Sequence, residues 1–250
     1  SRDQQKKGTN VLFVDESIFP QNLAVIQTRV IPQGMKIQVG NYKELEFTPE
    51  IFACIIQYPN ASGSVEDYRE FVEKAHAANC KVAVDADILS LALLLPPGEW
   101  GADIVFGSTQ RLGIPLFYGG PSAAYFATRD EYKRNMPGRI IGLSKDKYGK
   151  ICYRMALQTR EQHIKREKAT SNICTAQALL ATMAGFYAVY HGQEGIKNIA
   201  KRIHSIATWL NKALARLGYV QHNEIFFDTL RFSLPDHVSA QKLRTIALSK

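Results

Sequence analysis

The feature that most constrains the fold is the alternation of short apolar runs with amphipathic segments over the first 110 residues. The apolar runs have the length of buried strands and span residues 10–15, 36–40, 53–59, 81–87 and 102–108. Strands that are apolar on both faces and alternate with helices are typical of a mostly parallel sheet covered on two sides. The sequence therefore predicts an α/β fold.

Two helices are predicted between these strands. Residues 20–31 begin with proline and place Leu23, Ile26 and Val30 at helical spacing. Residues 64–80 form a second amphipathic stretch, in which we expect Ser64 to cap the helix and Asp67 to complete a capping box.

The second half of the chain changes character. Its pattern predicts two strands within residues 139–157, helices near 175–190 and 195–217, a strand at 224–234 and a helix at 238–249. We expect a large domain over residues 1–190 that lacks its N-terminal part. A partial small α/β domain is expected over 191–250, so we interpret the chain as a fragment.

Composition excludes several classes of protein. The content of 46% hydrophobic and 22% charged residues is typical of a soluble globular protein, and the uncharged run at 88–97 is too short to cross a membrane. The net charge of +8 is dispersed and is not interleaved with stacking aromatics, which favours an acidic protein partner over nucleic acid. Cys54, Cys80, Cys152 and Cys174 show no metal-binding spacing, and we predict reduced core thiols and no metal site.

Acidic side chains follow the predicted strand at 81–87. Asp85 and Asp87 lie where ligands bind in parallel α/β folds, beyond the carboxyl ends of strands. A carboxylate there could pair with the pyridinium nitrogen of pyridoxal phosphate (PLP). The alternative is that these residues cap the helix that follows.

The segment GSTQRLGIPLFYGGPS, residues 107–122, is a second candidate. Its glycines permit close backbone approach, and its polar side chains could donate to a phosphate or carboxylate. No nucleotide-binding glycine pattern is present. The candidate pocket residues here are Ser108, Thr109, Gln110, Arg111, Gly119 and Gly120.

A third candidate is the polar stretch that precedes the helix expected near 175–190. Donors ahead of a helix can bind an anion, whereas a solvated basic face is the alternative interpretation. Its candidate residues are Gln158, Arg160, His163, Arg166, Thr170, Ser171 and Asn172.

Long motifs in this sequence resemble those of the glycine decarboxylase (P-protein) family of the glycine cleavage system. They are VEDYREFVEKAH, PPGEWGADIVFGSTQRLGIPLFYGGPSAAYFATRDEYKRNMPGRIIG, YRMALQTREQHIKREKATSNICTAQALLATMA, YHG and FFDTL, in family order along nearly the whole chain. The resemblance implies a PLP-dependent fold-type I architecture with a large, mainly parallel domain and a smaller α/β domain. It places this chain in the N-terminal half of the enzyme, or in a separate first subunit.

The resemblance also implies where the cofactor binds. In the family the lysine that carries PLP belongs to the other half, and Thr109, Gln110 and Arg111 occupy the equivalent loop here. An amide nitrogen is not nucleophilic and a guanidinium stays protonated, so neither forms an imine. We therefore expect no covalent cofactor and no catalytic residue on this chain.

The implied reaction is the decarboxylation of glycine, with transfer of the aminomethyl group to the lipoyl arm of H-protein. The implied partners are the C-terminal half, or second subunit, and lipoylated H-protein, with no nucleic acid and no membrane. We expect the isolated chain to be inactive, and the location to be cytoplasmic if bacterial and mitochondrial matrix if eukaryotic. Two alternatives stay open: an independent PLP enzyme that uses Lys145 or Lys168, and a structural partner with a vestigial pocket.

Overall fold

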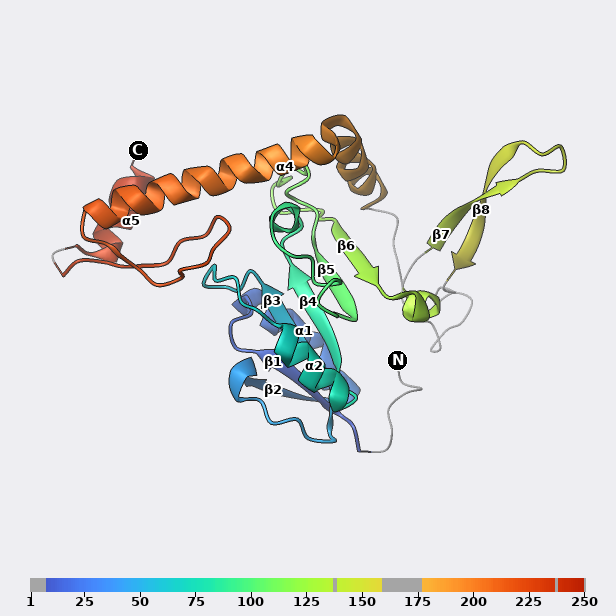
Figure 1. The fold of residues 1–250 in the computed structure, drawn as a ribbon, viewed down its shortest axis with the longest axis horizontal. Helices are drawn as coiled ribbons and strands as arrows, with labels where there is room; N and C mark the ends of the chain where they lie inside the picture. The colour runs from blue at the N-terminus through green and yellow to red at the C-terminus, as the bar shows by residue number, and fades with distance from the viewer. Residues whose placement is uncertain (1–7, 137–138, 159–176, 237, 250) are drawn as a thin grey trace.

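The computed structural model describes residues 8–136, 139–158, 177–236 and 238–249. Its centre is a sheet of strands in the order β2-β1-β3-β4-β5-β6, in which only β6 runs antiparallel to its neighbour (Figure 1). The prediction of a mainly parallel α/β fold is therefore confirmed. The strands are β1 (Val11–Asp15), β2 (Lys36–Gly40), β3 (Ile51–Tyr58), β4 (Lys81–Ala86), β5 (Ile104–Ser108) and β6 (Ala124–Thr128).

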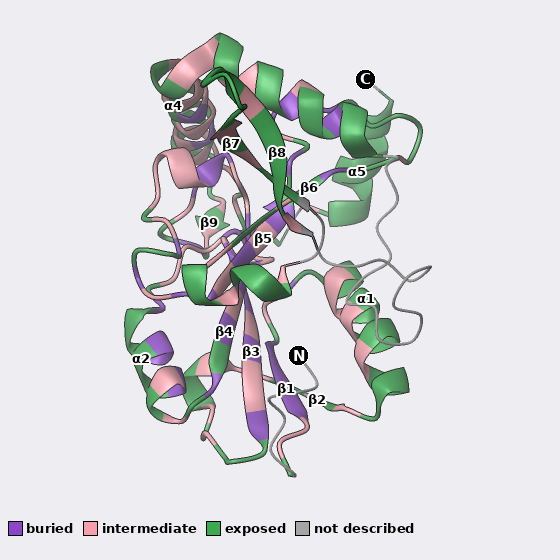
Figure 2. Ribbon diagram, turned by 90° about the vertical axis from the view of Figure 1, so that its right-hand side faces the viewer, coloured by how far each residue is buried: buried purple, intermediate pink, exposed green. Residues whose placement is uncertain are grey.

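Helices cover the two faces of this sheet because successive strand residues point in opposite directions. Leu12 and Val14 of β1 belong to a cluster with residues of α1 (Pro20–Val30). Val11 and Phe13 belong to a separate cluster with residues of α2 (Arg69–Ala77). Figure 2 shows the two helices on opposite sides of the strands. Short 3₁₀ turns complete this half at Ile31–Gln33, Tyr42–Glu44, Ser90–Ala92 and Asp130–Asn135.

Helix α2 begins later than predicted. Its N-cap is Tyr68, and Ser64 does not cap it. Instead, the Ser64 N–H donates to Asn60 Oδ1 at 3.0 Å, and Ser64 forms an isolated β-bridge with Phe226. The prediction was wrong because residues near Ser64 are held extended by a distant part of the chain.

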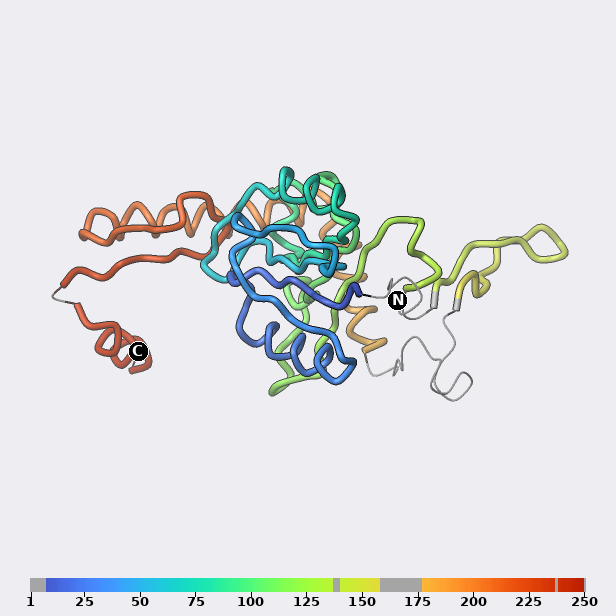
Figure 3. The backbone as a smooth tube through the Cα atoms, turned by 90° about the horizontal axis from the view of Figure 1, so that it is seen from below, coloured from blue at the N-terminus to red at the C-terminus, as the bar shows by residue number. Residues whose placement is uncertain are grey.

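The second half consists of a hairpin and a long helix. Strands β7 (Arg139–Lys145) and β8 (Ile151–Gln158) pair antiparallel, as predicted, and project from the sheet (Figures 1 and 3). The two predicted helices form α4 (Ala178–Arg216), with non-helical backbone at Gly192 (φ 62°, ψ −179°). The helix α5 (Ala240–Leu248) begins at Ser239, whose side chain accepts from the Lys242 N–H. None of the described helices is long and apolar enough to cross a membrane.

The strand predicted at 224–234 is mostly absent. Only β10 (Phe232–Ser233) is extended in a ladder, paired with β9 (Val220–Gln221). Residues 224–231, which we call the docking segment, lie instead against the turn after β3. The Val65 N–H donates to the Ile225 carbonyl at 2.9 Å, and Phe227 is buried.

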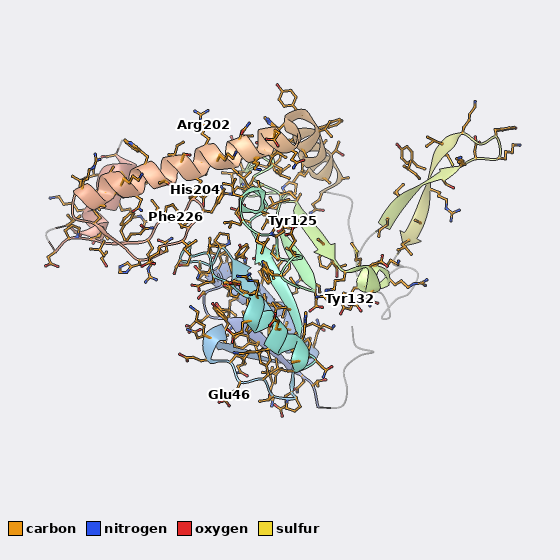
Figure 4. All side chains as sticks on the ribbon, in the orientation of Figure 1. Glu46, Tyr125, Tyr132, Arg202, His204 and Phe226 are labelled. Carbon is orange, nitrogen blue, oxygen red and sulfur yellow. The ribbon has the colours of Figure 1, made fainter. Side chains whose placement is uncertain are left out.

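Helix α4 holds the other side of the docking segment. A ring nitrogen of His204 lies 2.7 Å from the Phe227 carbonyl oxygen, and the His204 and Phe226 rings are 5.5 Å apart (Figure 4). Residues 224–234 alternate like a strand, but their apolar side chains pack between α4 and the turn after β3 and not in a sheet.

Two of the predicted core thiols are in the core. Cys54 and Cys80 are buried with their Sγ atoms 3.4 Å apart. Cys152 is only half-buried, on the projecting β8, so its assignment to the core was wrong. Cys174 lies outside the described residues.

The docking segment predicts a steric requirement at Gly63. A Cβ at Gly63 would lie 2.5 Å from the Thr229 carbonyl oxygen, whereas one at Gly34 would meet nothing within 4 Å. Both glycines have nearly the same positive φ, 78° and 76°. We expect Gly34→Ala to lower the free energy of unfolding by about 1 kcal/mol, from backbone strain alone. Gly63→Ala should lower it by about 3 kcal/mol, because the clash is added.

Urea unfolding of the two variants measures this difference. Equal losses at the two positions would show that the docking segment does not press against Gly63.

Candidate functional site at the carboxyl edge of the sheet

The candidate site lies where the parallel strands end. Strands β1, β3, β4 and β5 point the same way, so their carboxyl ends meet at one edge. The loops that follow these strands carry the polar residues predicted as candidates. The described residues there form three groups: a carboxylate on β4, an ion-paired triad and a loop after β5.

The first group surrounds Asp85. Its Oδ2 accepts from Asn22 Nδ2 at 2.5 Å, and Gln57 Nε2 donates to its carbonyl oxygen at 3.1 Å. Burial raises the pKa of Asp85 to about 6, although the hydrogen bonds from Asn22 and Gln57 act in the opposite direction. The carboxylate is therefore already engaged by neighbouring amides of this chain.

The second group is a triad of one cation and two carboxylates. Arg111 Nη2 lies 2.8 Å from Asp87 Oδ2 and 2.5 Å from Asp228 Oδ2. The guanidinium carbon is also 5.7 Å from the centre of the Phe227 ring. Burial raises the pKa of Asp87, and the charge of Arg111 opposes that rise. The triad joins the loops after β4 and β5 to the docking segment.

Asp87 also bonds to the two residues that follow Ile88. Its Oδ1 accepts from the Leu89 N–H at 3.0 Å, and its carbonyl oxygen accepts from Ser90 Oγ at 2.8 Å. These bonds lie just ahead of the 3₁₀ turn Ser90–Ala92, whose N-cap is Leu89 and has no side-chain cap bond, and Asp87 pairs with Arg111 as well. The structure therefore does not contain the helix cap that the sequence offered as the alternative to a cofactor contact.

The third group is the loop between β5 and β6. A cavity of about 180 Å³ lies here, and its lining includes Ser108, Gln110 and Gly119. Ser108 Oγ accepts from the Gln110 N–H at 3.1 Å. Thr109 is buried, and its Oγ1 has no hydrogen-bond partner among the described residues. Gly120 closes the loop beside Gly119, and both have positive φ.

The residues of this edge can be tested against the requirements of PLP. Imine formation needs an amine, and the loop from residue 108 to 123 contains no lysine. A ring nitrogen needs a carboxylate, but Asp85 is bonded to Asn22 and Asp87 to Arg111. The one cation of the loop, Arg111, is committed to two carboxylates. Arg111, Asp87 and Asp228 therefore satisfy one another, and the loop supplies no amine for an imine.

The third predicted region cannot be placed in the same way. Gln158 ends β8, and nothing is described of its side chain. The remaining candidates lie outside the described residues: Arg160, His163, Arg166, Thr170, Ser171 and Asn172. Among the residues that the structure describes, no group of three or more histidine, cysteine or acidic residues could hold a metal ion.

Sequence reasoning missed four residues of this edge. Asn22 and Gln57 contact Asp85, Asp228 completes the triad, and the Tyr125 hydroxyl donates to the Ala86 carbonyl at 2.8 Å. Asp228 lies in FFDTL, one of the motifs that carry the family resemblance, and this motif could have identified it as a candidate. The other three carry no local signal, because their partners are distant in the sequence.

The environment of Asp85 predicts an unusual titration. We expect its carboxyl group to titrate near pH 6 in a ¹³C NMR experiment. The raised pKa means that the folded state disfavours the ionised carboxylate. Ionised Asp85 therefore lowers the free energy of unfolding above pH 6, and this loss is recovered as the pH falls from 6 towards 4. Asn22→Ala should raise the pKa further, because it removes a bond to the carboxylate.

Asn198→Ala, at an exposed position on α4, is the matched control and should leave the titration unchanged. A midpoint near 4 in the unmodified chain would contradict the burial of Asp85.

Comparison with known proteins places this geometry in a family. The family described as "Glycine cleavage system P-protein" matches residues 1–250. The glycine dehydrogenase (decarboxylating) of Bacteroides thetaiotaomicron is 79% identical over 250 residues, which are 100% of this chain and 26% of the relative. The mitochondrial glycine dehydrogenase (decarboxylating) of Dictyostelium discoideum is 54% identical over 226 residues, 90% of this chain and 23% of the relative.

Solved structures agree. A glycine decarboxylase (P-protein) of the glycine cleavage system, in inhibitor-bound form, superposes with a TM-score of 0.77 at 28% identity, covering 97% of this chain and 65% of that one. The cysteine desulfurase CsdA of Escherichia coli shares the fold, with a TM-score of 0.62 at 17% identity, covering 99% of this chain and 61% of that one. The architecture is that of the fold-type I PLP-dependent enzymes.

The chain spans about a quarter of the length of the curated relatives it matches. Because the family match extends over all 250 residues, the chain belongs to the glycine cleavage system P-protein family.

Proposed function

We propose that this chain is part of a glycine dehydrogenase (decarboxylating), in which it supports the active site without carrying the cofactor lysine. In the proposed reaction glycine loses carbon dioxide, and its aminomethyl carbon bonds to one sulfur of the lipoyl disulfide on H-protein. The disulfide is reduced as its S–S bond breaks, and the second sulfur, which stays on the lipoyl chain, takes a proton from solvent and becomes a thiol. The names of relatives up to 79% identical support this assignment.

The observation that carries the proposal is the position of Arg111. It lies in the loop after β5. The resemblance implies that the equivalent loop of the other half carries the cofactor lysine, whereas here Arg111 is ion-paired with Asp87 and Asp228. A guanidinium held in this way has no free amine and no free charge to offer a cofactor. The chain's own contribution is to hold the loops of this edge and the docking segment in fixed positions.

PLP, bound by the other half, would supply the electron sink for decarboxylation. The proposed partners are that half, as a C-terminal region or a second subunit, and lipoylated H-protein. The proposed location is the cytoplasm of a bacterium or the mitochondrial matrix of a eukaryote. We further propose a large domain over residues 1–190 and the start of a smaller one over 191–250, beside the bend at Gly192.

Two other functions were open from the sequence. An independent PLP enzyme gains no support from Lys145, because it ends β7 on the hairpin that projects from the sheet (Figure 3). Lys168 lies outside the described residues. The other function is a structural scaffold with a vestigial pocket. An experiment on the loop after β5 distinguishes it from a half that completes the active site.

The site of cofactor attachment tests the proposal. The test protein is the glycine dehydrogenase of B. thetaiotaomicron, with its matched quarter replaced by these 250 residues, which we call the full-length chimaera. Incubation with PLP, borohydride reduction and peptide mass spectrometry should label one lysine stoichiometrically, outside the 250 residues. Stoichiometric labelling of Lys145 or Lys168 would overturn the proposal, and Lys145→Arg is the control for non-specific modification.

The role of the loop is tested through Gln110. This exposed amide lines the cavity, and its side chain has no hydrogen-bond partner among the described residues. If the loop completes the active site, Gln110→Ala in the full-length chimaera should lower kcat/KM for glycine about tenfold, with an unchanged melting temperature. Lys74→Ala, at an exposed side chain of α2, is the control. Unchanged kinetics would favour the scaffold.

A further inference from the structure

The β7–β8 hairpin has one face built almost entirely of large apolar side chains. Residues directly opposite each other in an antiparallel pair share a face, and the pairs here are Ile141 with Met155, Leu143 with Tyr153, and Lys145 with Ile151. We call the five apolar members the apolar hairpin face. All are exposed: Ile141 56%, Leu143 72%, Ile151 76%, Tyr153 78% and Met155 46%.

The opposite face of the hairpin carries smaller and more polar residues over most of its length. Its cross-strand pairs there are Gly142 with Arg154 and Ser144 with Cys152, and beyond a bulge at the base Ile140 pairs with Leu157. A ribbon standing alone in water has no reason to gather its large apolar residues on one side, since both sides meet solvent. The one-sided pattern is that of a sheet whose apolar face packs against something.

Nothing in the described part of the chain covers the apolar hairpin face. β7 and β8 contact each other extensively, and no other described helix or strand packs closely against them. None of the hairpin residues belongs to the core clusters. Figure 2 shows β8 exposed along most of its length. An isolated two-stranded hairpin is at best marginally stable in water, so a covering surface would contribute to its order.

The charges around this face select the chemistry of the covering surface. Between residues 140 and 158 the cations are Lys145, Lys147, Lys150 and Arg154, and the single carboxylate is Asp146. A complementary surface is therefore apolar at its centre and acidic at its rim. A second copy of this chain is disfavoured, because a two-fold contact between identical hairpins would bring the two basic rims together.

The relatives are much longer than this chain, so the covering surface can belong to the same protein. The B. thetaiotaomicron enzyme matches the whole of this chain with only 26% of its own length, so almost three quarters of it lies outside the match. We propose that the apolar hairpin face docks against an apolar, acid-rimmed surface in the part of the P-protein outside these 250 residues. This rests on the proposed function, since it requires the chain to work within the longer enzyme.

Two tyrosines of the hairpin give an internal comparison. Tyr153 lies on the apolar hairpin face and is 78% exposed, whereas Tyr148 lies in the turn and is 73% exposed. In the full-length chimaera, hydroxyl-radical footprinting read by peptide mass spectrometry should oxidise Tyr153 about tenfold more slowly than Tyr148, because interface cores are packed like protein interiors. Equal rates would overturn the proposal.

Adjacent substitutions on opposite faces sharpen the test. Leu143→Asp should bring the Tyr153 rate up to that of Tyr148, whereas Ser144→Asp should leave the tenfold ratio intact. If both variants or neither change the ratio, this face is not the docking surface. Protection of Tyr153 that disappears on dilution would assign the contact to a second copy and overturn the proposal.

Failure of the proposed function has a different signature. A full-length chimaera that does not decarboxylate glycine would remove the assigned activity, while the ratio of the two tyrosine rates would still report whether the hairpin is covered.

Discussion

The arrangement of the carboxyl edge depends on one guanidinium. Arg111 holds Asp87 and Asp228 together, and without it two half-buried carboxylates would face each other across the loop after β5. Coulomb repulsion and desolvation would then both disfavour the ionised form of these carboxylates. With Arg111 in place, the triad joins residues more than 100 positions apart, and Phe227 lies beside the guanidinium in a cluster with Leu89 and Ala200.

This interaction gives the docking segment its conformation. Residues 224–231 have the alternation of a strand, but their backbone and side chains are used by the turn at Gly63, by His204 and by Arg111. The charged groups of the edge are consequently paired within the chain itself. A pocket of the same fold that accommodates a cofactor needs uncommitted groups, and here the carboxylates and the cation are committed to each other.

Much of the fold could be predicted from the sequence, because apolar periodicity in β1 to β5 is a local property that the sheet preserves. The start of α2 and the strand at 224–234 could not, since both are decided by the contact between Val65 and Ile225. The same division applies to the site. Asp85, Asp87 and Arg111 were identifiable at strand ends, whereas Asn22 was not, because its role comes from one hydrogen bond between the first turn of α1 and β4.

The bend at Gly192 has a consequence for how this region tolerates sequence change. An unbroken helix of 39 residues would fix the angle between any two of its side chains, because each residue turns the helix by about 100°. With the helix broken at Gly192, Leu180 and Ala184 can face the core around Leu112 while Ala200 faces Leu89 and Phe227. The helix segments before and after Gly192 can therefore rotate about their axes independently. A mutation that rotates one segment against its core need not change the packing of the other.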